Sequence, residues 1–162
     1  MVWNLLVVFV VVVILIIIGR RLPDARRKFK EVKITSDEEI NFISLVAQAD
    51  DAFEVRKYEK AEGLYVKAAA EDPDNAKIYS RLGAIYLEQK NFYDAKEAYA
   101  QAAKLEPDLA SRHANLGLSF MGLKDYYKAM DSFKKALALD KKNKKYTNLF
   151  ERAQKSYEKE KN

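Results

Sequence analysis

The chain repeats itself with a period of 34 residues over most of its length. The central copy, Ala76 to Asp108, matches the residues on both sides of it at this spacing. Forward by 34 residues, the matched pairs are Leu82 and Leu116, Gly83 and Gly117, Tyr86 and Phe120, Phe92 and Tyr126, Ala95 and Ala129, Tyr99 and Phe133, Ala102 and Ala136, and Leu105 and Leu139. Backward, they are Phe92 and Tyr58, Ala95 and Ala61, Tyr99 and Tyr65, Ala102 and Ala68, and Pro107 and Pro73. This regularity predicts a stack of three similar units, because each unit buries its apolar face against its neighbours.

Apolar residues recur at helical spacing twice within each copy. In the central copy, Leu82 and Tyr86 belong to the first segment, and Ala95 and Tyr99 belong to the second. A polar run over residues 88–91 separates the two segments. Each copy therefore predicts two helices that form a hairpin.

Small residues indicate where the helices of a hairpin approach each other closely. Gly83 and Gly117 lie on the inner face of the first helix, and Ala95 and Ala129 lie on the facing side of the second. Pro107 ends the second helix, so that the next hairpin can begin.

The periodicity predicts helices over residues 37–54, 58–71, 75–89, 92–104, 109–122, 126–139 and 143–160. Ser36 and Glu39 have the spacing of a capping box at the start of the first helix. The last helix carries one apolar stripe on a charged background, formed by Tyr146, Leu149, Phe150, Ala153 and Tyr157. Such a stripe is typical of a terminal helix that covers the last hairpin and faces water on its other side.

The period, the glycine, the paired alanines, the aromatic residues and the closing proline of the central copy resemble the tetratricopeptide repeat family. The resemblance implies an all-α, right-handed α-solenoid. Its three hairpins would occupy residues 36–142, with repeats at about 42–75, 76–109 and 110–143, and a capping helix would follow at 143–162. The first copy departs from the pattern, because Gln48, Ala49 and Ala52 stand where the central copy has Leu82, Gly83 and Tyr86.

Residues Val2 to Ile18 are apolar except for Asn4. At 1.5 Å per residue they span roughly 25 Å, near the lower limit for crossing a bilayer. No basic residue precedes them, and no cleavage site with small residues follows them. These flanks favour an uncleaved anchor over a signal peptide. We therefore expect a single transmembrane helix at residues 1–19.

A basic linker at residues 20–35 follows this segment. Between Arg20 and Lys33 there are seven basic and two acidic residues, which account for the whole net charge of +5. By the positive-inside rule, we expect the N-terminus to face outward and the repeats to be cytoplasmic. The basic residues are either only the stop-transfer signal or a contact for anionic lipid head groups. The candidate membrane-surface residues are Arg20, Arg21, Arg26, Arg27, Lys28 and Lys30.

The residues that carry chemistry are sparse. There is no cysteine and one histidine, His113, which stands 34 residues after Tyr79 and is expected to be structural. No nucleophile elbow, P-loop or dinucleotide fingerprint occurs. We expect no enzyme activity, no catalytic residue, no cofactor, no metal site and no small-molecule substrate. The charge balance of the repeats gives no reason to expect a nucleic-acid partner.

A stack of helical hairpins usually presents a groove, lined by its first helices, to a protein or peptide. The candidate groove residues are Val46, Asp50, Phe53, Lys77, Ser80, Arg81, Ala84, Leu87, Ala114, Asn115, Leu118 and Met121. Among them, four apolar residues form a possible strip, namely Phe53, Leu87, Leu118 and Met121. The alternative is that some of these side chains pack against neighbouring second helices or the cap.

Some members of the resembled family hold the acidic C-terminus of heat-shock chaperones in a clamp of lysine, arginine and asparagine side chains. Here Asp50 and Ala84 occupy two of those places, so we do not expect this activity. We expect a membrane-anchored scaffold or adaptor that binds proteins through the groove. The alternative is a receptor for a peptide or targeting signal that delivers clients to membrane machinery.

Overall fold

A computed structural model describes residues 39–162 of the chain. The predicted anchor, the basic linker with its six candidate residues, and Ser36 of the capping box lie outside the described residues. Of the helices between residues 39 and 162, none combines the length and the hydropathy that a membrane span requires.

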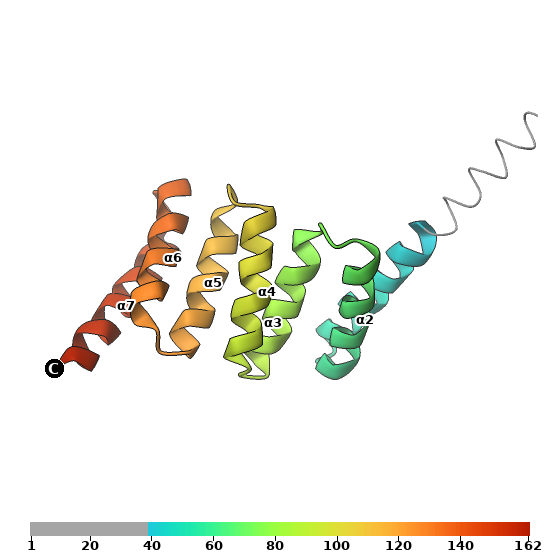
Figure 1. Ribbon diagram of the computed structural model, residues 1–162, viewed down its shortest axis with the longest axis horizontal. Helices are drawn as coiled ribbons and strands as arrows, with labels where there is room; N and C mark the ends of the chain where they lie inside the picture. The colour runs from blue at the N-terminus through green and yellow to red at the C-terminus, as the bar shows by residue number, and fades with distance from the viewer. Residues whose placement is uncertain (1–38) are drawn as a thin grey trace, which may run out of the picture. The chain divides into compact units, whose positions relative to one another are not determined.

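The described part of the chain is all-α. A first helix covers residues 39–54, and six helices follow it: α2 (Tyr58–Glu71), α3 (Ala76–Glu88), α4 (Phe92–Leu105), α5 (Ala110–Gly122), α6 (Tyr126–Leu139) and α7 (Lys144–Lys161). The boundaries from α2 onward differ from the predicted ones by at most one residue. Residues 44–162 form one compact unit, in which successive helices run antiparallel beside one another (Figure 1). The prediction of an all-α repeat fold is confirmed.

Each hairpin turn has the same hydrogen-bonded closure. The backbone N–H of Lys57 donates to Ala52 at 2.8 Å, that of Asn91 to Tyr86 at 2.8 Å, and that of Asp125 to Phe120 at 3.0 Å. This bond spans six residues, as in the helix ending that places its next-to-last residue in the left-handed conformation. Those residues have positive φ and are all basic, namely Arg56 (56°), Lys90 (60°) and Lys124 (59°).

Two glycines make room for aromatic rings in the hairpin cores. A Cβ on Gly83 would lie 2.8 Å from the ring of Tyr99, and a Cβ on Gly117 would lie 2.6 Å from the ring of Phe133. Distances below about 3 Å are sterically prohibitive between carbon atoms. The predicted close approach at both glycines is present, but their nearest neighbours are these rings rather than the expected alanines.

The apolar stripe of α7 faces the third hairpin. Ala153 is fully buried in a cluster with Ala114, Ala129, Phe133 and Ala136, and Tyr146, Leu149 and Phe150 pack against that cluster. The ring of Tyr157 lies 6.2 Å from that of Tyr127, measured between centroids. One face of α7 is therefore part of the core, and its other side chains face solvent.

Candidate partner-binding surface

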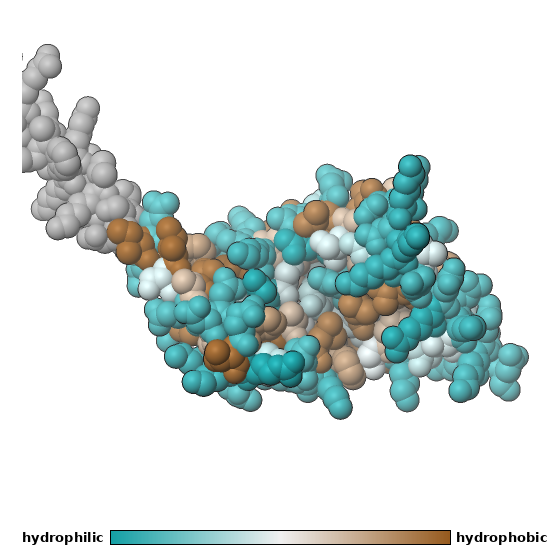
Figure 2. All heavy atoms as spheres, turned by 180° about the vertical axis from the view of Figure 1, so that it is seen from behind, coloured by the Kyte–Doolittle hydropathy of each residue, from teal (hydrophilic) through white to brown (hydrophobic). Residues whose placement is uncertain are grey.

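The candidate groove residues lie on the first helices of the three hairpins, which are the helix at residues 39–54, α3 and α5. Lys77 is exposed, and ten others are half-buried. Ala114 is different, since it is 3% exposed and belongs to the core cluster under α7. Its assignment to the groove was wrong, because the turn of α5 that carries it faces α6 and α7. On the side turned away in Figure 1, hydrophobic residues form separate patches among hydrophilic ones (Figure 2).

Asp50 makes two side-chain contacts, one within the first hairpin and one to the second. Its Oδ1 accepts a hydrogen bond of 2.5 Å from the hydroxyl of Tyr65 and lies 3.1 Å from Nε of Arg81. The Arg81 guanidinium also lies 5.5 Å from the centre of the Phe53 ring, within the range of a cation–π interaction. Burial, and then the bond to Asp50, raise the pKa of Tyr65 well above its usual value. Asp50 and Arg81 therefore neutralise each other within the surface.

A second tyrosine–carboxylate pair lies beside the first. The hydroxyl of Tyr86, on α3, donates a hydrogen bond of 3.1 Å to Oε1 of Glu62, on α2. Burial and this bond raise the pKa of Tyr86 to about 12. Because the neutral hydroxyl is the donor, both pairs persist throughout the physiological pH range.

Replacing Tyr65 with phenylalanine is expected to lower the free energy of unfolding by about 1.5 kcal/mol, because a buried bond to a charged acceptor is lost. Chemical denaturation followed by circular dichroism measures this change. The matched control is Tyr93→Phe, which removes a hydroxyl from a side chain that is 61% exposed. It should change stability by less than about 0.5 kcal/mol. Equal effects of the two substitutions would contradict the role assigned to Asp50.

Arg112 connects the second and third hairpins. It donates to Oγ of Ser80 through one terminal nitrogen at 2.6 Å, and to Oε2 of Glu106 through Nε at 2.7 Å. The neighbouring His113 donates from Nε2 to the carbonyl of Pro107 at 2.7 Å. Sequence reasoning missed this network, because no local motif indicates that these side chains meet. The hydrogen bond from Arg112 holds the Ser80 side chain in place, and His113 is held by its own hydrogen bond to the Pro107 carbonyl.

The apolar side chains of the candidate groove are partly exposed, and some of them also pack against the core. Leu118 and Met121 pack against the core cluster of the third hairpin, while each keeps part of its surface exposed. Phe53 contacts the ring of Tyr58 at a centroid distance of 5.9 Å. Leu87, on α3, is half-buried. The strip thus presents partial side-chain surfaces from successive first helices.

A separate groove of about 530 Å³ lies between α4, α5 and α6. It is lined by Tyr93, Lys96, Glu97, Ala100, Leu116, Phe120, Leu123, Asp125 and Lys128. Lys96 pairs with Glu97 at 2.6 Å, and Lys128 pairs with Asp125 at 2.8 Å, so the rim is neutral. None of these residues was a predicted site residue. The sequence feature that could have indicated this groove is Tyr93, an aromatic residue that follows the repeated Phe92.

Within residues 39–162, no group of three histidine, cysteine, aspartate or glutamate side chains is placed to hold a metal ion. Every buried side-chain nitrogen and oxygen in this part of the chain has a hydrogen-bond partner. The candidate surface presents apolar side chains, hydrogen-bonding groups and charged groups.

Two models of the tetratricopeptide repeat match the chain, one at residues 52–117 and one at residues 110–143. Among curated proteins, no sequence matches it significantly. The first TPR domain of Spaghetti (RPAP3), solved bound to the HSP90 peptide SRMEEVD, is 21% identical with a TM-score of 0.68, over 72% of this chain and 92% of that one. The Sgt2 TPR domain from Aspergillus fumigatus is 21% identical with a TM-score of 0.69, over 75% and 82%.

The second TPR domain of human RPAP3, in complex with the HSP70 peptide SGPTIEEVD, is similar to the same degree. It is 23% identical with a TM-score of 0.68, over 72% of this chain and 98% of that one. Identities this low show a shared fold and carry no ligand from one protein to another.

Proposed function

Because residues 52–143 belong to the tetratricopeptide repeat family, we propose that the repeat domain is a protein-interaction scaffold or adaptor that binds partners along its first helices. The observation that carries the proposal is the strip of half-buried apolar side chains on successive first helices, of which Leu87 and Met121 are the central members. Partly exposed apolar side chains flanked by polar ones are typical anchors for a bound segment. We propose no catalytic reaction for the domain.

We propose an apolar or amphipathic segment as the ligand. The similar domains of RPAP3 were solved with chaperone peptides that end in EEVD. In this chain an acidic peptide would compete with Asp50 for Arg81, and the Asp50 carboxylate would repel it. Lys77 and Asn115 remain as polar neighbours of the strip and can contact the backbone of a bound segment.

We also propose that the domain is held at a membrane by residues 1–19, followed by the basic linker at 20–35. The support is the sequence, in which an apolar stretch from Val2 to Ile18 precedes a basic one. With the positive charge on its C-terminal side, the anchor would place the N-terminus outside and the repeats in the cytoplasm. In a second candidate function, the groove receives a peptide or targeting signal and passes it to membrane machinery. Weak, rapidly reversible binding of short amphipathic peptides would favour this candidate.

The variant Leu87→Arg with Met121→Arg is expected to weaken partner capture by roughly 2 kcal/mol, or about thirtyfold. Photo-crosslinking from position 80 in intact membranes, followed by mass spectrometry, identifies the partner whose affinity is then measured. The matched control is Leu109→Arg with Leu139→Arg, which makes the same changes at two leucines that are each 45% exposed and outside the strip.

Both variants must keep the melting temperature of the unchanged chain, because Met121 also contacts the core. If Met121→Arg destabilises the domain, Leu87→Arg alone provides the test. Undiminished capture by a stable strip variant would contradict the proposed site. Tight binding of an EEVD peptide by the unchanged chain would contradict the proposed ligand.

A further inference from the structure

The groove of about 530 Å³ between α4, α5 and α6 is lined mainly by apolar side chains. Leu116, Phe120 and Leu123 line it from α5. They recur at helical spacing on a face of α5 that differs from the face carrying the apolar strip, since the strip residues of this helix are Leu118 and Met121. This α4–α5–α6 groove is therefore separate from the surface proposed above for partner capture.

The 34-residue period gives the groove an equivalent between α2 and α3. There the hydroxyl of Tyr86 donates a hydrogen bond of 3.1 Å to Oε1 of Glu62, and this bond links the two helices. In the α4–α5–α6 groove, Phe120 stands at the place of Tyr86, and Lys96 stands at the place of Glu62. Neither partner of that hydrogen bond is present, and the ammonium of Lys128 instead lies 5.7 Å from the centre of the Phe120 ring.

The same period gives a second equivalent between α6 and α7, where an aromatic ring takes the place of a leucine. Tyr127 corresponds to Tyr93, and Tyr157 corresponds to Leu123. The rings of Tyr127 and Tyr157 lie 6.2 Å apart between centroids at an angle of 47°, within the range of favourable aromatic pairs. The chain's own fold thus shows that an aromatic ring fits against a tyrosine at this position. In the groove the shorter leucine leaves room beside Tyr93, which is 61% exposed.

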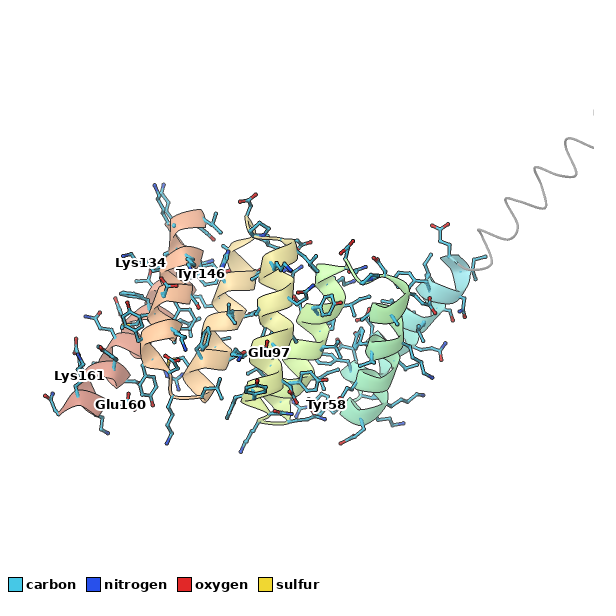
Figure 3. The ribbon with its side chains drawn as sticks, viewed as in Figure 1. Tyr58, Glu97, Lys134, Tyr146, Glu160 and Lys161 are labelled. Atoms are coloured by element: carbon cyan, nitrogen blue, oxygen red, sulfur yellow. The ribbon has the colours of Figure 1, made fainter. Side chains whose placement is uncertain are left out.

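The charges at the rim of the groove favour an uncharged occupant. Lys96 pairs with Glu97 at 2.6 Å, and Lys128 pairs with Asp125 at 2.8 Å, so each lysine is neutralised by a carboxylate. Glu97 lies on α4 and marks one wall of the groove in Figure 3. A charged side chain would meet a like charge in each pair and would lose water against the apolar lining, whereas a neutral ring avoids both costs.

We propose that the α4–α5–α6 groove is a second binding site of the repeat domain, which takes an aromatic side chain from a partner protein. The bound ring packs between Tyr93 and Leu123 and contacts Phe120 below them. Its angle against Tyr93 resembles that of Tyr157 against Tyr127. The proposal depends neither on the apolar strip nor on the anchor, because a ring bound here leaves the strip free.

The probe is N-acetyl-tyrosinamide, and N-acetyl-leucinamide is its non-aromatic counterpart. In the full chain, held in lipid nanodiscs and labelled at its leucine methyl groups, the NMR signals of Leu116 and Leu123 are expected to shift and to saturate on titration with the tyrosine probe. Its affinity should exceed that of the leucine probe by about threefold or more, because aromatic pairs add stability beyond the area that they bury. Equal affinities, or shifts that do not saturate, would overturn the proposal.

The decisive variant is Leu123→Tyr, which gives α5 the residue that α7 carries at the equivalent position. The new ring should take the place beside Tyr93 and abolish the saturable response of the Leu116 methyl groups. The melting temperature should not fall, because Leu123 is 40% exposed. The matched control is Leu139→Tyr, the same change at a leucine that is 45% exposed and does not line the groove. It should keep the response, and an undiminished response in Leu123→Tyr would contradict the proposed site.

Two further variants keep the test independent of that substitution. Tyr93→Ser removes an exposed ring and should lower the affinity for the tyrosine probe to that for the leucine probe. Leu87→Arg alters the apolar strip and should leave the response of Leu116 and Leu123 unchanged. Loss of the response in Leu87→Arg, with the melting temperature retained, would place the probe on the strip and overturn the proposal.

Discussion

Replacing Gly117 with leucine is expected to lower the free energy of unfolding by about 3 kcal/mol. A first side-chain carbon at this position would already lie 2.6 Å from the ring of Phe133. That ring is fully buried and shares its cluster with Ala129, Ala136 and Ala153. A leucine at this position therefore displaces the ring from its buried place or opens the third hairpin.

The matched control is Gly63→Leu in α2. Nothing lies within 4 Å of the position that a Cβ on Gly63 would take. This substitution replaces a poor helix former with a good one and should stabilise the domain by about 0.5 kcal/mol or more. Chemical denaturation followed by circular dichroism compares the two variants. A Gly117→Leu variant as stable as the unchanged chain would contradict the packing of Phe133 on this glycine.

The helices were predictable because they rest on local and periodic signals. A period of 34 residues repeats each helical pattern three times, and Asn75, Asn91 and Asn143 mark helix starts by accepting backbone hydrogen bonds. The role of the apolar stripe on the last helix was also predictable, because an apolar face on a charged helix requires a neighbour that covers it. From α2 onward, the predicted boundaries agree with the structure to within one residue, because these signals agree with one another.

The candidate site was less predictable, because it depends on which side chains meet between helices. Asp50 and Arg81 were both predicted to lie in the groove, but their ion pair depends on the distance between the first two hairpins. The bond from Tyr65 to Asp50 depends on how α2 packs against the helix at residues 39–54. Ala114 was assigned to the groove by its register, while its burial follows from the position of α6 and α7.

The backbone conformation of the hairpin turns could not be predicted from the sequence either. Basic residues at positions 56, 90 and 124 are visible in the sequence, yet nothing local shows that each has a positive φ. That conformation emerges only when the hairpin closes through its six-residue hydrogen bond.

Truncating the chain after Asn143 is expected to make the repeat domain aggregate. Removal of α7 uncovers the face of the third hairpin that now packs against Ala153, Leu149 and Phe150. An exposed apolar face at the end of a repeat array promotes association between molecules, which is why such arrays end in a helix with a polar outer side. Size-exclusion chromatography with light scattering should show higher oligomers of the truncated chain under conditions in which the unchanged chain does not form them.

A point substitution tests the same packing without shortening the chain. Ala153→Glu places a charged side chain at a fully buried position of α7 and should cost about 3 kcal/mol or more, enough to detach the helix. Gln154→Glu introduces the same charge one residue later, at an exposed position, and should change stability by less than about 0.5 kcal/mol. Amide hydrogen exchange should show loss of protection throughout α7 in the first variant and native protection in the second. If both variants kept α7 protected, the helix would not be held by its apolar stripe, and the buried position of Ala153 would be wrong.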